Sequence, residues 1–218
     1  MISPAYGLAL EANATDAPAL AECYGPWEGI CSNHVITSSG KFAGPDGSSR
    51  SISSEADREL LIALRAHADV IVVDAATARR ERYRLPSSGA RLVVFSSSGV
   101  LAGIPAIQET SDSCFLFSPN RPMDFPERQY VPIRNPENPL QDLSQWAIRE
   151  SLPALLLEAG PTLSKSAFNN KLVSFSALTI SEQNQDLDAL AKSHPFDDSA
   201  LLVSVAHSNQ ATFTYWTH

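Results

Sequence analysis

Residues 69–73 read Asp-Val-Ile-Val-Val, and this run of β-branched residues predicts a strand that is buried on both faces. Two runs of the same kind follow, Arg-Leu-Val-Val-Phe at residues 91–95 and Ala-Leu-Leu-Leu at residues 154–157. Strands buried on both faces belong to parallel sheets that helices cover on each side. We therefore expect these three runs to form adjacent strands at the centre of an α/β sheet.

Further helices and strands are predicted on either side of these runs. The clearest helix begins with a capping box, in which Ser54 precedes Asp57 by three residues, and it continues with leucines at helical spacing. The other predicted elements are strands at residues 31–37, 114–117, 129–133, 172–180, 201–206 and 212–216, and helices at residues 17–23, at residues 139–151 and from Pro161 onward.

The order of these elements predicts the fold class. Only residues 207–210 separate the last two strands, which indicates an antiparallel hairpin. We expect a three-layer α/β fold, with a mixed, mostly parallel sheet, helices on both faces and an antiparallel C-terminal hairpin. Residues 1–29 are expected to form an N-terminal arm on a single domain of residues 30–218.

The last predicted strand is apolar and aromatic. It carries Phe213, Tyr215 and Trp216. Two interpretations are open: these side chains form an exposed sheet edge that favours a dimer, or they are buried within the monomer.

Composition and charge exclude several classes of protein. The chain has 218 residues, of which 44% are hydrophobic, so it can bury a substantial core. Its net charge is −8, from 16 basic and 24 acidic residues, so nucleic-acid binding is not expected. The N-terminus lacks the pattern of a signal peptide, and no apolar run approaches the ~20 residues that cross a bilayer.

The cysteines and histidines show no pattern of a metal site. Cys23, Cys31 and Cys114 form no Cys-x-x-Cys pair, which indicates reduced thiols in a cytoplasmic protein. The five histidines have no metal-ligand spacing. We therefore expect no metal ion.

Three polar turns follow predicted strands, at the edge where ligands bind in open α/β sheets. They are Thr-Ser-Ser-Gly-Lys at residues 37–41, Asp-Ala-Ala-Thr at residues 74–77 and Glu-Ala-Gly-Pro-Thr-Leu at residues 158–163. The third turn opens a helix, and free N–H groups at a helix start can bind an anion. The alternative is an ordinary strand-to-helix turn. Arg65 either points at these strand ends or is a solvated helix charge.

Taken in order, these segments resemble the reductase half of the riboflavin-pathway bifunctional deaminase–reductase, in its short actinobacterial-type form. The resemblance runs from about Leu20 onward. The matched family segments are N-M-V-x-S-L-D-G at residues 33–40, L-R-A-x-A-D-V at residues 64–70, V-G-A-G-T-V-R-A-E-x-Y at residues 73–83 and E-G-G-P-x-L at residues 158–163.

The resemblance implies a dihydrofolate-reductase-like fold, a homodimer, and NADPH-dependent reduction of a small pyrimidine- or pteridine-like heterocycle. The implied activity is that of the 5-amino-6-(5-phosphoribosylamino)uracil reductase. It implies Ser39 as the catalytic residue of the turn after the first strand. The implied substrate-binding residues are Asn33, Thr37, Gly40, Ser53 and Arg65. The implied cofactor-binding residues are Asp74, Ala75, Ala76, Thr77, Ser96, Glu158, Ala159, Gly160, Pro161, Thr162 and Leu163.

The chain departs from the family segments at several positions. Asp74, Ala76 and Ala159 replace glycines, and Ser39 replaces the aspartate of the Asp-Gly turn. Glycine serves where the backbone approaches a ligand, and a carboxylate at position 74 would repel a pyrophosphate. If the cofactor site persists, Asp74 should turn away or pair with Arg79 or Arg80. The alternative hypothesis is a family member without catalysis that serves as a ligand-binding or interaction protein.

Overall fold

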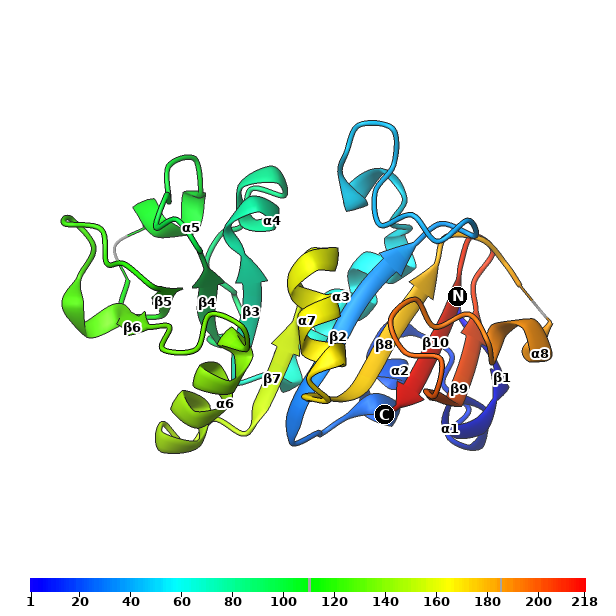
Figure 1. The fold of residues 1–218 in the computed structure, drawn as a ribbon. Coiled ribbons are helices and arrows are strands. Elements are labelled where there is room, and N and C mark those ends of the chain that lie inside the picture. The colour runs from blue at the N-terminus through cyan, green and yellow to red at the C-terminus, as the bar shows by residue number, and fades with distance from the viewer. Residues whose placement is uncertain (110, 185) are drawn as a thin grey trace.

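The computed structural model describes residues 1–109, 111–184 and 186–218. Within these residues one ten-stranded sheet runs through the molecule, in the order β1-β9-β10-β8-β2-β7-β3-β4-β5-β6 (Figure 1). The strands are β1 (Ser3–Tyr6), β2 (Gly29–Ile36), β3 (Val70–Asp74), β4 (Arg91–Phe95), β5 (Cys114–Ser118), β6 (Tyr130–Pro132), β7 (Ala154–Leu157), β8 (Val173–Ile180), β9 (Leu201–His207) and β10 (Thr212–Thr217).

The predicted central strands are adjacent. β3 pairs in parallel with β7 on one side and with β4 on the other, with Val72 opposite Leu157 and Val93. The sheet is parallel from β8 to β6, while β1, β9 and β10 pair antiparallel. The predicted mixed, mostly parallel sheet with a C-terminal hairpin is therefore confirmed, with strand ends shifted by one or two residues.

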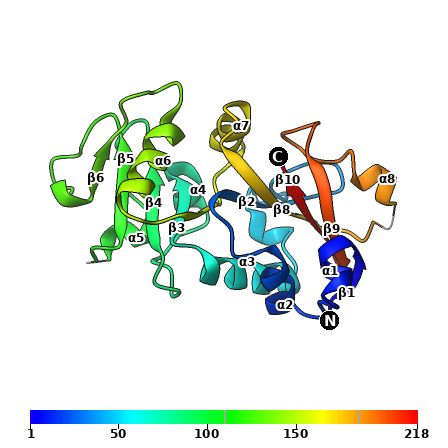
Figure 2. The ribbon, with the colours of Figure 1, turned by 90° about the horizontal axis from the view of Figure 1, so that it is seen from below.

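Helices cover both faces of the sheet because the buried strands alternate their side chains between the faces. Leu156 packs with α2 and α3, whereas Leu155 and Leu157 pack with α6 and α7. Figure 2 shows α7 on one side of the sheet and α2 and α3 on the other. The helices are α1 (Gly7–Glu11), α2 (Ala17–Tyr24), α3 (Glu55–His67), α4 (Ala75–Arg80), α5 (Pro105–Gln108), α6 (Pro139–Arg149), α7 (Pro161–Asn169) and α8 (Leu187–Leu190), with short 3-10 helices at Ser49–Ser51 and Glu127–Gln129.

The capping box predicted for α3 is present. The Ser54 hydroxyl accepts a hydrogen bond from the Asp57 N–H at 3.1 Å, and Leu60 and Leu64 are buried. This cap fixes where α3 begins, and the Arg65 side chain in its last turn reaches Glu158, which directly follows β7. Among the described helices, none is long and apolar enough to cross a membrane.

Both ends of the chain are integrated into the sheet. Ser3–Tyr6, within the segment predicted as an arm, forms β1 and pairs with β9, and α2 packs against α3. β10 lies between β9 and β8, so Phe213, Tyr215 and Trp216 are buried within the monomer. Of the two interpretations, burial within the monomer is confirmed. The interpretation as an exposed aromatic edge that favours a dimer is wrong, because the hairpin folds the last strand into the sheet interior.

Candidate functional site

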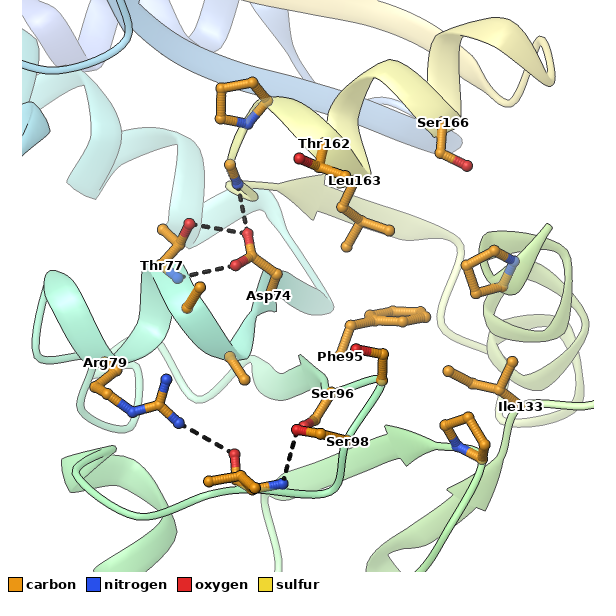
Figure 3. Close-up of a pocket in the computed structure, with 18 of the residues that line it drawn as sticks. Asp74, Thr77, Arg79, Phe95, Ser96, Ser98, Ile133, Thr162, Leu163 and Ser166 are labelled. Carbon is orange, nitrogen blue, oxygen red and sulfur yellow. Dashed lines mark hydrogen bonds between the residues drawn. The ribbon is translucent and has the colours of Figure 1, made fainter. Parts of the chain in front are cut away.

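Two cavities open beside the carboxyl ends of the parallel strands. The larger has a volume of about 850 Å³ and lies between the turns that follow β3, β4 and β7 (Figure 3). It brings together nine of the residues predicted to bind a cofactor. These residues are Asp74, Ala75, Ala76, Thr77, Ser96, Gly160, Pro161, Thr162 and Leu163. Turns that are far apart in the sequence thus meet at one cavity.

The Asp74 carboxylate ties two of these turns together. Its Oδ1 accepts a hydrogen bond from the Thr77 N–H at 2.9 Å, which caps α4. Its Oδ2 accepts from the Thr77 hydroxyl at 2.8 Å and from the Gly160 N–H at 2.6 Å (Figure 3). The carboxylate therefore binds one backbone N–H group in the turn after β3 and one in the turn before α7.

Of the two arrangements expected for Asp74, the pair with Arg79 or Arg80 is not found among the ion pairs of the described residues. Arg79 donates from Nε to the Ala102 carbonyl at 2.8 Å and from Nη2 to the Val100 carbonyl at 3.1 Å. Arg80 lies instead beside Glu81, with Nε 3.5 Å from Oε1. Asp74 does not need a cation, because three N–H and O–H groups already satisfy its oxygens.

Arg79 supplies the larger cavity with a cation that the turn after β4 lacks. That turn carries only Ser96, Ser97 and Ser98 on this wall. The Val100 and Ala102 carbonyls hold the Arg79 side chain at this cavity, and Figure 3 shows one of these two bonds. Sequence reasoning missed this placement because Arg79 belongs to α4 and reaches the cavity through contacts with the loop at residues 100–102.

The smaller cavity has a volume of about 590 Å³ and lies beside α3. Three predicted substrate-binding residues, Asn33, Ser53 and Arg65, line it. Glu158 and Ala159, which the sequence assigned to the cofactor, line this cavity instead of the larger one. The turn after β7 therefore contributes to both cavities.

Glu158 is held by Arg65 and Tyr83. Its Oε1 accepts from Arg65 Nε at 2.8 Å, its Oε2 accepts from Arg65 Nη2 at 2.5 Å, and the Tyr83 hydroxyl donates to Oε2 at 2.6 Å. The Glu158 side chain is only 4% exposed. A two-pronged pair of this kind fixes the guanidinium plane. Burial and the Glu158 charge raise the pKa of Tyr83, so its hydroxyl keeps its proton.

The turn after β2 lies outside both cavities. Thr37, Ser39 and Gly40 line neither the larger nor the smaller one. The Thr37 and Ser39 hydroxyls bond to each other at 2.9 Å, and the Gly40 N–H donates to the Thr37 carbonyl at 2.9 Å. Ser39 is exposed to solvent. The structure thus places Ser39 with Thr37 and Gly40, apart from the predicted site residues that line the two cavities.

Two further titratable groups line the smaller cavity. Nε2 of His34 lies 3.1 Å from the Ala159 carbonyl and 2.9 Å from the Ser164 hydroxyl, and burial lowers its pKa to about 4. Burial raises the pKa of Asp57, whose Oδ2 accepts from the Ser53 hydroxyl at 2.5 Å. Sequence reasoning gave His34 no role and took Asp57 as part of a helix cap, because neither shows metal-ligand or nucleophile spacing.

The smaller cavity is rich in cations. Six arginines line it against three carboxylates; the arginines are Arg50, Arg58, Arg65, Arg80, Arg82 and Arg84, and the carboxylates are Asp57, Glu81 and Glu158. Glu81 accepts from the Ser48 hydroxyl and the Ser49 N–H, which anchors the loop before α3 to this wall. The excess of arginine favours an anionic ligand.

The two cavities share one wall. Thr77, Arg80, Gly160 and Pro161 line both of them. A ligand in the larger cavity would therefore lie next to a ligand in the smaller one.

Residues 30–181 match the family described as the RibD C-terminal domain, which covers more than half of the chain. A search of curated proteins finds no match. Three solved structures are similar in fold. A pyrimidine reductase-like protein from Corynebacterium diphtheriae has a TM-score of 0.69 at 19% identity, over 93% of this chain and 98% of that chain.

The other two are more distant in sequence. A diaminohydroxyphosphoribosylaminopyrimidine deaminase/5-amino-6-(5-phosphoribosylamino)uracil reductase from Thermotoga maritima has a TM-score of 0.68 at 14% identity, over 87% of this chain but only 56% of that chain. The riboflavin biosynthesis reductase of Saccharomyces cerevisiae has a TM-score of 0.63 at 11% identity, over 87% of this chain and 89% of that chain. At these identities the likeness shows the fold alone. The matched residues include β2, α3, the Asp74 turn and the Glu158 turn, and the chain belongs to the RibD C-terminal domain family.

Proposed function

We propose that the protein is a cytoplasmic, NADPH-dependent reductase of a phosphorylated pyrimidine- or pteridine-like heterocycle, similar to the 5-amino-6-(5-phosphoribosylamino)uracil reductase of the riboflavin pathway. One observation carries the proposal. Two cavities of different chemistry meet at a common wall formed by Thr77, Arg80, Gly160 and Pro161. Hydride transfer requires a cofactor and a substrate side by side, and this wall is where they would meet.

The larger cavity fits the cofactor through its side chains. Its volume of about 850 Å³ lies within the range of cofactor sites, about 300–1,000 Å³. Arg79, Ser96, Ser98 and Thr162 would hold the phosphates, because Asp74 already binds the N–H groups of Thr77 and Gly160. When bound there, NADPH would supply the hydride for reduction of a ribose carbonyl or a similar group.

The smaller cavity fits an anionic substrate. Its arginine-rich lining suits a phosphate group, and Glu158 holds Arg65 in one orientation. Orientation and electrostatics are the contribution of the protein in hydride-transfer enzymes. A site that only orients its ligands and stabilises charge does not require a nucleophile paired with a base.

A second function is favoured by one specific observation. The Asp74 carboxylate places a negative charge on the wall of the larger cavity. A family member that has lost cofactor binding and acts as a ligand-binding or interaction protein would tolerate this charge.

A steady-state assay tests the proposed activity. Purified protein is mixed with NADPH and 5-amino-6-(5-phosphoribosylamino)uracil, and loss of nicotinamide absorbance is followed. We expect turnover in the wild type and a loss of about ten- to a hundred-fold in Arg80→Gln, since a charge-assisted hydrogen bond contributes about 1.5–3 kcal/mol. The matched control is Arg149→Gln, at an exposed arginine outside both cavities. Substrate binding without turnover would favour the second function.

The resemblance also leads us to propose a homodimer. The described strands at the two sheet edges are β1 and β6, and Leu8 and Leu10 are exposed directly after β1. Light scattering at micromolar protein should give twice the monomer mass. A monomer mass would reject the dimer.

A further inference from the structure

We propose that Asp74 determines which ligands the larger cavity accepts, because it acts as an internal anion at the junction of the two turns. The proposal rests on the proposed function only in taking a dinucleotide as one ligand of this cavity. In this arrangement a phosphate group does not bind between Thr77 and Gly160. The anionic part of any ligand is instead directed to the side of the cavity where Arg79 lies.

The first argument is that the Thr77 and Gly160 N–H groups at the junction are already bound and are not open to a ligand. Thr77 N–H and Gly160 N–H come from turns 83 residues apart, as 160 − 77 = 83, and both point at the same carboxylate. The Thr77 hydroxyl donates to that carboxylate as well. N–H groups at the start of a helix are the usual binding groups for phosphates. Here the protein supplies the anion itself (Figure 3).

The second argument is steric. A Cβ added at Gly160 would lie 2.8 Å from the Thr77 hydroxyl oxygen and 3.2 Å from Asp74 Oδ2. The junction therefore has no room for even one additional carbon atom. A phosphate could reach the two N–H groups only if the Asp74 side chain left them.

The third argument is electrostatic. None of the ion pairs found among residues 1–109, 111–184 and 186–218 involves Asp74, so its charge faces the cavity without a cationic partner. The Arg79 guanidinium, in contrast, is held at the same cavity by two uncharged carbonyl groups and keeps its full positive charge. Opposite charges on two parts of one cavity orient a bound ligand.

Calorimetric titration with inorganic pyrophosphate tests the proposal without any need for catalysis. The variants are Asp74→Gly, which frees both N–H groups, and Asp74→Ser, whose hydroxyl can still cap α4. We expect weak or undetectable binding to the wild type and binding at least ten-fold tighter in both variants. NADPH should bind about five- to a hundred-fold tighter in Asp74→Gly, as expected for loss of a repulsive charge.

The matched control is Asp69→Ser. Asp69 lies immediately before β3, and its Oδ2 accepts a hydrogen bond from the Ala154 N–H at 2.9 Å, but it lines neither cavity. This variant also loses a carboxylate that accepts a hydrogen bond from a backbone N–H. It therefore reproduces the loss of that hydrogen bond without a change in the charge of either cavity. Pyrophosphate binding should not change in it.

The outcomes separate this proposal from the proposed function. Pyrophosphate binding that is unchanged in every Asp74 variant that folds would overturn the role of Asp74, even if the wild type binds NADPH. Tighter pyrophosphate binding in either variant supports it, even if the wild type shows no reductase activity. Should Asp74→Gly fail to fold, Asp74→Ser decides alone.

Discussion

Each cavity has a carboxylate at the end of one of two neighbouring central strands, Asp74 in the larger cavity and Glu158 in the smaller one, and these two carboxylates are held in opposite ways. Asp74 is the last residue of β3 and Glu158 directly follows β7, the strand next to it. Backbone N–H groups and a hydroxyl bind Asp74, whereas the guanidinium of Arg65 and the Tyr83 hydroxyl bind Glu158. Neutral donors leave the charge of Asp74 in place, while Arg65 neutralises Glu158.

This difference separates the chemistry of the two sites. The larger cavity carries the Asp74 charge at the junction of two turns, and its cations are Arg79 and, on the shared wall, Arg80. Around Glu158 the smaller cavity keeps an excess of arginines. Neighbouring strands of one sheet therefore produce two cavities that favour different parts of a ligand.

The largest effect is expected from breaking the Glu158 pair. Arg65→Leu leaves Glu158 buried without a cation, and the free energy of unfolding should fall by about 3–5 kcal/mol. Urea unfolding measures it. The double variant Arg65→Leu with Glu158→Leu should recover most of that loss, since no charge is then left buried. A double variant no more stable than Arg65→Leu would show that the pair is not what holds this wall.

A substitution of Asp74 should lower the free energy of unfolding by less than Arg65→Leu, because uncharged partners hold the Asp74 side chain. In Asp74→Asn an amide N–H₂ replaces the oxygen that accepts from Gly160, and the free energy of unfolding should fall by about 2 kcal/mol. The same urea experiment compares it with Arg65→Leu. A loss as large as that of Arg65→Leu would contradict the contrast between the two carboxylates.

The pH dependence of stability should report on the wall of the smaller cavity. Burial lowers the pKa of His34 to about 4, below its unfolded value of about 6.5. Between these values the unfolded chain binds more protons than the folded one. The free energy of unfolding should therefore fall by about 1 kcal/mol per unit as the pH drops from 6.5 toward 4.

Buried His194, whose pKa is lowered to about 3, adds to the same trend. His34→Gln should reduce the slope of stability against pH relative to the wild type in urea unfolding. An unchanged slope would show that His34 takes up a proton in the folded protein as readily as in the unfolded one.

The smallest effect is expected at the turn outside both cavities. Ser39→Ala should change the free energy of unfolding by less than about 0.5 kcal/mol, as is usual for exposed side chains. It should also leave reductase turnover and ligand binding unchanged. A large loss of turnover would place Ser39 at the reacting groups and would restore the role that the family resemblance gives it.

Much of the fold could be predicted from local patterns. The runs that form β3, β4 and β7 are continuous and apolar, and Ser54 and Asp57 mark the start of α3. β1 could not be predicted, because its four residues have no periodic pattern and pair with β9, which lies about 200 residues further along the chain.

The sequence predicted which turns form the candidate site, but it did not predict which side chains contact one another there. The sequence located the Asp74 and Glu158 turns, since each follows a buried strand. It could not show that Glu158 points to Arg65 and Tyr83, because these partners lie 93 and 75 residues away. Asp74 was expected either to turn away or to pair with an arginine, and no local pattern reveals that Gly160 from another turn would donate a hydrogen bond to it.

Equilibrium titration of the wild-type protein with NADPH, followed by nicotinamide fluorescence, tests the central claim most directly. We expect saturable binding in the micromolar range, weakened in Arg79→Gln because that side chain is a cation of the larger cavity away from the wall shared with the smaller one. Absence of any fluorescence change at millimolar NADPH would contradict the claim that this cavity holds a dinucleotide, and the ligand-binding function without catalysis would then stand in its place.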